Sequence, residues 1–324
     1  MMRIVFFGSG EFGLPTLGVL RERHDVALVV TQPDRPAGRK RVLTATPVAV
    51  WAVEQGLTVI KPPKVNAPEI VEQIRAARAD ANVVVAFGQK IGDAVIASPR
   101  VGRVATMNLH ASLLPRYRGA APINWAIVRG EQVAGNTVFS LVDRMDAGDI
   151  LGMQSTEIGR METAGELHDR LAGMGAGLVM DVLSRLEAGT LKAVAQDESR
   201  ATLAPKISRE DAVVDFAGDA EDIRRRVHGF YPWPGVTVWY GAGGPGARGL
   251  DPSHPGKELR LCRVDAVEGR GEPGVMVEDG VVACGRGAVR LLEVQPAGKR
   301  VMSWEEFNRG AKLRVGEVFS GRLA

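Results

Sequence analysis

The chain has 324 residues, with 41 lysines and arginines against 38 aspartates and glutamates, and a formal net charge of +3. This length predicts two domains, and so small a net charge does not by itself indicate a nucleic-acid-binding protein. No apolar run is long enough for a membrane-spanning helix. The first residues enter a strand directly, so we expect no signal peptide. Because Cys262 and Cys284 lack metal-ligand spacing, we expect a cytoplasmic protein with reduced thiols.

Strands and helices alternate through the first part of the chain. Apolar runs predict strands at residues 3–7, 25–31, 58–60, 82–87, 104–109, 136–141 and 150–155. Helices are expected after residue 13 to about 23, and at 47–55, 67–77, 123–129 and 166–186. This alternation is typical of an α/β domain with a Rossmann-like, mostly parallel sheet, which we place at residues 1–189.

A glycine-rich turn follows the first predicted strand. Gly8-Ser9-Gly10-Glu11-Phe12-Gly13 matches the dinucleotide-binding pattern, and Asp34 lies near the distance of a ribose-binding acid. A nicotinamide-dependent dehydrogenase is therefore one open alternative. The motif is weak because any tight strand-to-helix turn favours glycine, and Asp34 lies beyond Pro33, outside the strand end.

A basic loop follows the second predicted strand. Four of the ten residues from Gln32 to Arg41 are basic and one is acidic. The basic ones are Arg35, Arg39, Lys40 and Arg41. Such a loop beside the carboxyl edge of the sheet is suited to a phosphate backbone, and the alternative is a solvated surface loop.

Asn108 and His110 lie two residues apart at the end of the strand at 104–109, so their side chains point to the same side. The carboxyl ends of strands are where open α/β sheets place their sites. A second polar turn, residues 143–149, could fold over this one and supply one working carboxylate, since its aspartates lack the alternation of a metal site. The alternative is a buried asparagine and histidine satisfied by backbone groups.

The periodicity fades over residues 190–206, which we interpret as a linker, and changes character in the remainder, 207–324. Short alternating strands at 235–240, 258–267, 274–278, 281–284 and 288–294, with one helix at 219–227, predict a small OB-like β-barrel or a sandwich. Residues 241–256 form a glycine- and proline-rich insertion, expected to be a hairpin tip. Basic residues cluster at 224–226, 299–300 and 309–314, where they could bind phosphates or form surface salt bridges.

Motifs along the whole chain resemble those of the methionyl-tRNA formyltransferases. The first ones are Gln-Pro-Asp-Arg-Pro-Ala-Gly-Arg from residue 32, Asn-Leu-His-Ala-Ser-Leu-Leu-Pro from 108, Arg-Gly-Ala-Ala-Pro from 118 and Met-Asp-Ala-Gly-Asp from 145. The later ones are Ala-Pro-Lys-Ile-Ser from 204, Trp-Pro-Gly from 233 and Gln-Pro-Ala-Gly-Lys from 295. The chain departs from the family at Gly8-Ser9-Gly10, where Gly-Thr-Pro is usual, and in its longer insertion at 241–256.

The resemblance implies transfer of the formyl group of 10-formyltetrahydrofolate to the α-amino group of methionyl-initiator tRNA, without a metal. It assigns catalytic roles to Asn108, His110 and Asp146. The folate contact would be Ser112, Leu113, Leu114 and Pro115, and the tRNA contact Arg35, Arg39, Lys40 and Arg41. Residues 207–324 would be a tRNA-binding domain, and we expect a monomer. The rivals are an enzyme that formylates a small amine, such as a sugar nucleotide or a purine precursor, and a non-catalytic tRNA-binding protein.

Overall fold

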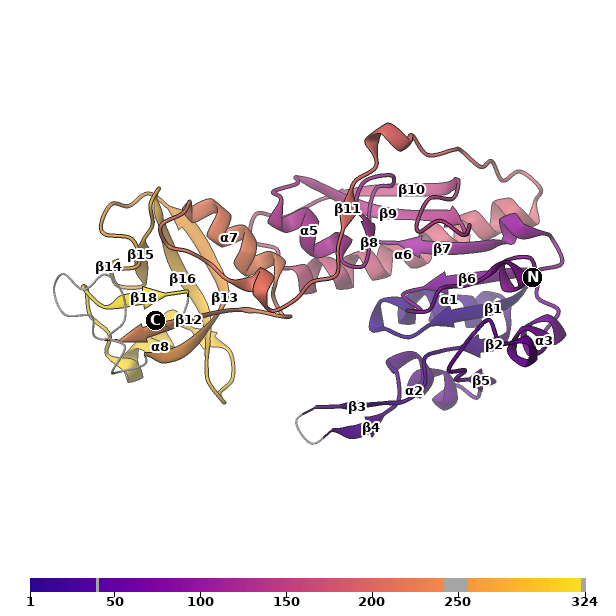
Figure 1. The fold of residues 1–324 in the computed structure, drawn as a ribbon, viewed down its shortest axis with the longest axis horizontal. Helices are drawn as coiled ribbons and strands as arrows, with labels where there is room; N and C mark the ends of the chain where they lie inside the picture. Colours follow the sequence, from indigo (N-terminus) through magenta and orange to yellow (C-terminus); the bar gives the residue numbers. More distant parts are fainter. Residues whose placement is uncertain (39–40, 242–255, 322–324) are drawn as a thin grey trace. The chain divides into compact units, whose positions relative to one another are not determined.

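The structure is a computed structural model that describes residues 1–38, 41–241 and 256–321 (Figure 1). Two residues of the predicted tRNA-binding loop, Arg39 and Lys40, lie outside the described residues, as do residues 242–255 of the predicted hairpin tip. The chain forms two compact units. The first unit comprises Met1–Pro122, Val133–Thr156 and His168–Ala204, and the second comprises Ile123–Gln132, Glu157–Leu167 and Pro205–Ala324.

The first unit is built on a seven-stranded sheet with the strand order β10-β9-β7-β6-β1-β2-β5. Its strands are β1 (Arg3–Gly8), β2 (Asp25–Val30), β5 (Val59–Ile60), β6 (Ala81–Val85), β7 (Thr106–His110), β9 (Val133–Ser140) and β10 (Ile150–Glu157). The β5-β2-β1-β6-β7 portion is parallel, and β9 runs antiparallel to β7. The predicted Rossmann-like, mostly parallel sheet is confirmed.

Helices cover both faces of this sheet. They are α1 (Leu14–Arg23), α2 (Pro47–Glu54), α3 (Pro68–Ala76), α4 (Asp93–Ile96) and α6 (Ala164–Glu187), whose first turn is assigned to the second unit. Helix α5 (Pro122–Val128) belongs to the second unit except for Pro122. Val5 and Phe7 of β1 pack with Ile74 of α3 and Ile96 of α4 in one core cluster. Leu109 of β7 points to the opposite face, where α6 approaches so closely that a Cβ at Gly175 would lie 2.6 Å from the leucine side chain. The alternation of the strand residues therefore puts Asn108 and His110 on the α3 side.

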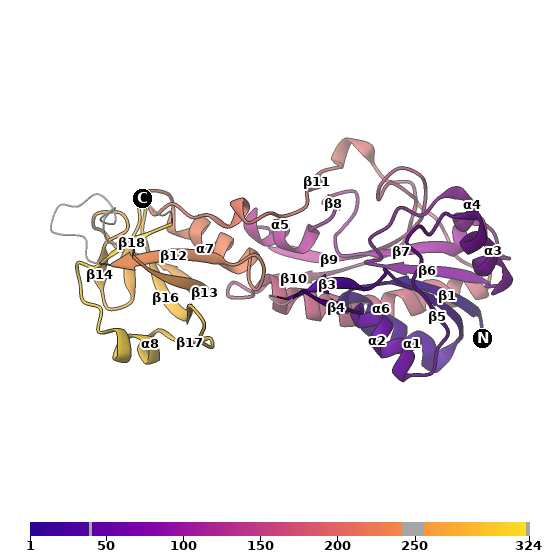
Figure 2. The same ribbon diagram turned by 60° about the horizontal axis from the view of Figure 1, so that its bottom comes forward.

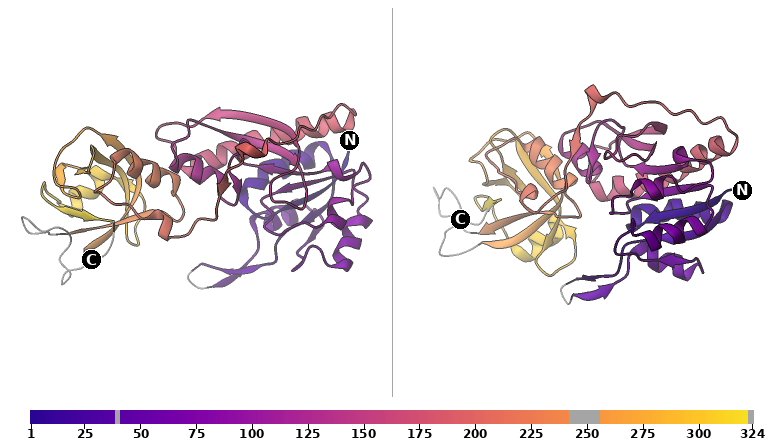
Figure 3. Two further views of the ribbon diagram at one scale, coloured as in Figure 1. Left: turned by 45° about the horizontal axis from the view of Figure 1, so that its top comes forward. Right: turned by 45° about the vertical axis from the view of Figure 1, so that its right-hand side comes forward.

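Two further short strand pairs belong to the first unit. The basic loop folds as a hairpin of β3 (Arg35–Ala37) and β4 (Val42–Thr44), which projects from the sheet as a two-stranded arm (Figure 1). The sequence predicted a loop there because strands of three residues are too short to carry a periodic signal. After α6, residues 190–204 run along the outside of the unit and end in β11 (Leu203–Ala204), which pairs with β8 (Arg118–Gly119) (Figure 3).

The second unit contains an antiparallel barrel. Its strand order is β14-β15-β16-β13-β12-β18, with β17 added to β16. The strands are β12 (Val236–Gly241), β13 (Lys257–Val267), β14 (Met276–Glu278), β15 (Val281–Ala283), β16 (Ala288–Pro296), β17 (Met302–Ser303) and β18 (Val318–Ser320). A bridge between Val275 and Val318 joins the two ends of this order, which confirms the predicted β-barrel.

Helices α7 (Ala220–Gly229) and α8 (Trp304–Ala311) pack on the barrel sheet (Figure 2). The sequence patterns predicted α7 but not α8, β17 or β18. The signal for α8 was present, since Ser303 and Glu306 have the spacing of a helix cap and the Ser303 hydroxyl accepts from the Glu306 N–H. Short 3₁₀ turns complete the fold at Glu11–Gly13, Arg103–Ala105, Glu198–Arg200 and Glu210–Ala212.

Candidate active site

His110 ends β7 and is nearly buried, with 7% of its surface exposed. Its Nε2 lies 2.8 Å from the backbone oxygen of Tyr117. Because a carbonyl oxygen can only accept, Nε2 carries the hydrogen in the neutral ring and Nδ1 carries the lone pair. The edge of the ring packs against Phe139, with the two ring centroids 6.4 Å apart. The imidazole is thus held in one orientation with one nitrogen available for chemistry.

The available nitrogen faces a carboxylate from a distant turn. Asp146 Oδ2 lies 3.9 Å from His110 Nδ1 and accepts a 2.8 Å hydrogen bond from the Gly119 N–H. Asp146 adopts a left-handed backbone conformation with φ of 50°, which is uncommon for a residue with a side chain. The structure therefore brings the two residues together, although they lie on separate polar turns.

Asn108 precedes His110 by one pleat of β7 and is half-buried. Within the described part of the chain its side chain has no hydrogen-bond partner. A carboxamide with unused N–H groups beside an oriented imidazole can donate to an oxygen that gains negative charge.

The tetrapeptide Ser112–Pro115 follows β7 directly, and most of its polar groups are engaged within the unit. The Ser112 hydroxyl donates to the Arg116 carbonyl, and the Leu114 N–H donates to the Thr137 hydroxyl. Leu114 is buried, whereas the side chains of Leu113 and Pro115 are partly exposed. What this loop offers to a ligand is therefore mainly apolar surface.

A polar network that the sequence analysis did not identify supports the Asp146 turn. Gln196 donates from Nε2 to the backbone oxygens of Asp146 and Gly148, and Arg118 donates to Gln196 and to Glu198. Arg118 is 6% exposed, and its guanidinium lowers the pKa of the Glu198 carboxyl through their hydrogen bond. Gln196 comes from the segment predicted to be a linker, and a lone polar residue in a polar stretch gives no sequence signal of this kind.

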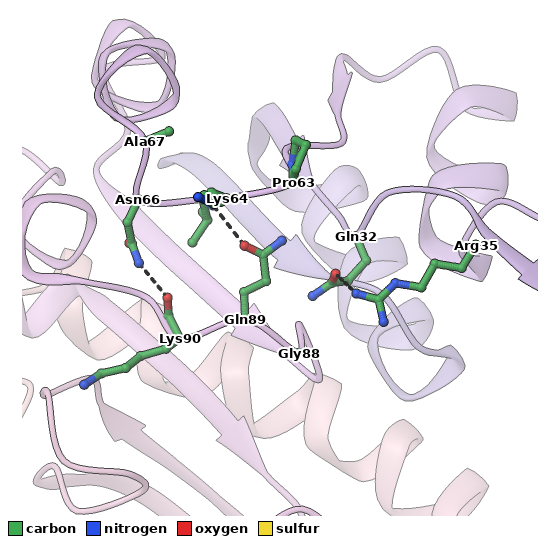
Figure 4. A pocket seen from close by; sticks show the side chains of 10 residues that line it. Gln32, Arg35, Pro63, Lys64, Asn66, Ala67, Gly88, Gln89 and Lys90 are labelled. Carbon is green, nitrogen blue, oxygen red and sulfur yellow. Dashed lines mark hydrogen bonds between the residues drawn. The ribbon is translucent and has the colours of Figure 1, made fainter.

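The described part of the basic hairpin borders a separate cavity of about 480 Å³ at the ends of β2, β5 and β6. Arg35, Lys64 and Lys90 are among its lining residues, together with Gln32 and Gln89 (Figure 4), and the Lys90 ammonium pairs with Asp143 at 2.6 Å. The Arg35 guanidinium donates to the Gln32 side-chain oxygen, and this bond holds Arg35 at the base of the arm. In contrast, Arg41 is exposed near the tip.

The basic clusters of the second unit differ in how they are used. Arg224 and Arg225 of α7 pair with Glu221, and Arg226 donates to the Asp211 carbonyl, so this cluster is structural. In contrast, Arg309, Lys312 and Arg314 at the end of α8 are exposed and have no ion-pair partner among the described residues.

In the described part of the chain, the residues of the dinucleotide-like pattern have structural roles. The described residues contain no group of three or more histidine, cysteine, aspartate or glutamate side chains that could hold a metal ion. Asp34, the candidate ribose-binding acid, instead pairs with Lys61 at 2.6 Å. The Gly8 turn is explained by packing, since a Cβ there would lie 2.5 Å from the ring of Phe6. No helix in the described ranges is long and apolar enough to cross a membrane.

Comparison with known proteins identifies the family of this chain. Residues 2–183 match the formyl transferase family model, and residues 206–312 match the model of the formyl transferase C-terminal domain. Methionyl-tRNA formyltransferase of Geobacter metallireducens is 42% identical over 320 residues, covering 97% of each chain. The protein of that name from Macrococcus caseolyticus is 38% identical and covers 99% of each chain. The chain belongs to the methionyl-tRNA formyltransferase family.

Solved structures share the fold of this family at low sequence identity. HypX from Aquifex aeolicus, in complex with tetrahydrofolic acid, aligns with a TM-score of 0.62 at 19% identity, covering 95% of this chain and 47% of HypX. WlaRD, a sugar 3N-formyl transferase, aligns with a TM-score of 0.65 at 15% identity, covering 93% of this chain and 99% of WlaRD. The dehydrogenase alternative is wrong, because the glycine turn lies within residues 2–183, which match the formyl transferase family model.

Proposed function

We propose that this protein transfers the formyl group of 10-formyltetrahydrofolate to the α-amino group of methionyl-initiator tRNA, giving N-formylmethionyl-tRNA for translation initiation. The observation that carries the proposal is the oriented His110–Asp146 pair in a chain that aligns over nearly its whole length with enzymes named for this reaction. The assay described below also distinguishes this function from formylation of a small amine and from tRNA binding without catalysis.

The reaction places three demands on the site. The attacking amine must be neutral, the formyl oxygen gains negative charge as the new C–N bond forms, and the folate nitrogen needs a proton as its bond to the formyl carbon breaks. Asn108 donates its side-chain N–H groups to the formyl oxygen. His110 takes the proton of the amine at Nδ1 and returns it to the departing nitrogen, and Asp146 stabilises the imidazolium in between.

The loop after β7 fits an aromatic co-substrate. Leu113 and Pro115 offer partly exposed apolar surface, while the polar groups of Ser112 and Leu114 hold the loop against Thr137 and Arg116. Flat rings stack well on such surface. We therefore assign the folate contact to Ser112, Leu113, Leu114 and Pro115, with the two partly exposed residues touching the folate and the other two shaping the loop.

The basic hairpin and the end of α8 are proposed to bind the tRNA. Phosphate contacts need exposed cations that are not neutralised by neighbouring carboxylates. On the described part of the hairpin, Arg41 and, at the base of the arm, Arg35 meet this need. Arg39 and Lys40 are assigned to the same contact from the sequence alone. Arg309, Lys312 and Arg314 meet it in the second unit. Accordingly, residues 1–189 are proposed as the catalytic domain, 190–206 as the connection and 207–324 as the tRNA-binding domain of a monomeric, cytoplasmic enzyme without a metal.

The assay that tests the function combines charged initiator tRNA with 10-formyltetrahydrofolate and detects N-formylmethionine after hydrolysis. Formylation of initiator methionyl-tRNA, with much slower formylation of charged elongator tRNA, is expected. A parallel reaction offers a nucleotide-linked amino sugar as the only amine. Turnover of the sugar without turnover of the tRNA would replace the proposal with the small-amine rival, and tRNA retention without transfer would indicate a binding protein.

A further inference from the structure

Gln196 reaches the candidate catalytic carboxylate from outside the predicted catalytic domain. Its Nε2 lies 2.8 Å from the backbone oxygen of Asp146 and 2.7 Å from that of Gly148. One carboxamide thus uses both of its N–H hydrogens to bridge the two carbonyls that flank Ala147. Asp146 has a φ of 50°, so the turn adopts a conformation that its own residues do not favour and that surrounding bonds must maintain.

The orientation of the carboxamide is fixed by a buried cation. Arg118 donates to Gln196 Oε1 from Nε at 3.2 Å and from Nη2 at 2.7 Å. Since a guanidinium can only donate, the oxygen of Gln196 must face Arg118 and the nitrogen must face the turn. Arg118 is itself 6% exposed and held by Glu198.

The same strand holds the other end of Asp146. Gly119, which follows Arg118 in β8, donates its backbone N–H to the Asp146 carboxylate at 2.8 Å. The backbone and the carboxylate of Asp146 are therefore both tied to β8, one through Gln196 and one directly. These two attachments restrict how far the Asp146 carboxylate can move from His110 Nδ1, which lies 3.9 Å away.

The segment that carries Gln196 does not depend on this side chain for its place. Backbone bonds attach it to β8, from the Arg118 N–H to Thr202 at 2.9 Å and from the Ala120 N–H to Ala204 at 2.9 Å. The two side-chain N–H hydrogens of Gln196 therefore bind only the Asp146 turn and are not needed to hold their own segment.

We propose that Gln196 is a positioning residue that holds the Asp146 turn so that its carboxylate stays against His110. This inference rests on the proposed function for its effect on turnover, but the position of the turn can be measured without it.

The deciding variant is Gln196→Glu. A glutamate keeps the length of the side chain and an oxygen toward Arg118, but it places an acceptor against two carbonyl oxygens. If Gln196 only anchored its segment to Arg118, Gln196→Glu would keep normal activity. If it positions Asp146, kcat should fall by about 10- to 100-fold, the range expected for a displacement near 1 Å, with the KM values of both substrates changed less than about threefold.

Two further variants complete the series. Gln196→Leu, which loses both contacts, should lower kcat at least as much as Gln196→Glu. Asp197 lies next to Gln196, is exposed and caps only the Ser199 turn. The control variant Asp197→Asn should therefore leave kcat and the KM values unchanged.

A second readout is hydrogen exchange measured on the free protein. In Gln196→Glu and Gln196→Leu, the amides of residues 143–149 and of Gly119 should exchange about tenfold faster than in the parent, while β7 keeps its protection. Parental kcat in Gln196→Glu, or unchanged exchange in the turn of both variants, would overturn the inference. A parent protein that does not formylate methionyl-tRNA would refute the proposed function, whereas the exchange experiment would still decide the role of Gln196.

Discussion

His110 Nδ1 faces Asp146 Oδ2 at 3.9 Å, while the other ring nitrogen is bound to the Tyr117 carbonyl at 2.8 Å. The two groups are close to each other but not hydrogen-bonded, since 3.9 Å exceeds hydrogen-bond length. A neutral ring directs its Nδ1 lone pair at the carboxylate, and protonation of that nitrogen converts the contact into an attraction. In the proposed reaction, Asp146 therefore stabilises the imidazolium that forms when His110 takes the proton of the amine.

The first prediction concerns this pair. In His110→Ala and in Asp146→Asn, kcat should fall by roughly two to four orders of magnitude, because the first variant removes the proton carrier and the second removes the charge that stabilises it. Single-turnover kinetics with saturating co-substrates would measure the effect. Asp143→Asn is the matched control, since Asp143 lies on the same turn, is exposed and pairs with Lys90 instead. Near-normal turnover in both His110→Ala and Asp146→Asn would refute the assignment.

The second prediction concerns the basic hairpin. Changing Arg39 and Arg41 to alanine should raise KM for tRNA and reduce the slope of log KM against log salt concentration by about two, because each phosphate contact contributes close to one. The affinity for folate should not change. Arg75→Ala serves as control because Arg75 lies on α3 and pairs with Glu72. An unchanged salt slope in the double variant would reject the role of the hairpin.

The third prediction concerns the packing of the Asp146 turn. A Cβ at Gly148 would lie 1.6 Å from the backbone oxygen of Ser140, so Gly148→Ala must displace the turn. We expect lower kcat together with a lower melting temperature. Gly177→Ala on α6 provides the contrast, since nothing lies within 4 Å of its Cβ position and the site is exposed. That variant should keep its activity and gain roughly 0.5–1 kcal/mol of stability from helix propensity. Parental kcat in Gly148→Ala would show that the turn tolerates the shift.

The fourth prediction concerns the stability of the second unit at acidic pH. Burial, followed by the charges of Arg224 and Arg263, lowers the pKa of His228 to about 4. The residue is fully buried, and its Nε2 accepts from the Val264 N–H at 3.2 Å. Because the unfolded chain binds this proton more readily, the neutral histidine contributes stability at neutral pH that is lost as the pH falls from about 6.5 toward 4.

The measurement compares the parent with His228→Gln, whose amide oxygen can still accept from Val264 but does not titrate. Between pH 7 and pH 5 the parent should lose on the order of 2 kcal/mol more unfolding free energy than the variant. Trp125, Trp233, Trp239 and Trp304 belong to the second unit and Trp51 to the first, so tryptophan fluorescence reports mainly on the relevant unit. Equal pH dependence in the two proteins would contradict the assignment.

Regular patterns in the sequence predicted most of the fold. The strands of both sheets that carry apolar runs or clear alternation were found, as was α6, whose start is marked by the Thr163 and Glu166 capping pair. The elements missed are all short, and their signals extend over too few residues to be periodic; they are α4, α8, β3, β4, β8, β11, β17 and β18.

By itself, the sequence determined the order of the elements, the two kinds of sheet and the position of Asn108 and His110 on one side of β7, because these follow from periods of two and 3.6 along the chain. The family resemblance already pointed to Asp146 among the three turn aspartates. Only the tertiary structure decided how close its carboxylate lies to His110, which ring nitrogen is available, and that Gln196 of the predicted linker supports the turn. It also decided that the arginines of α7 are paired while the cations at the end of α8 are not. These outcomes depend on distances between segments far apart in the chain, and local patterns carry no information about such distances.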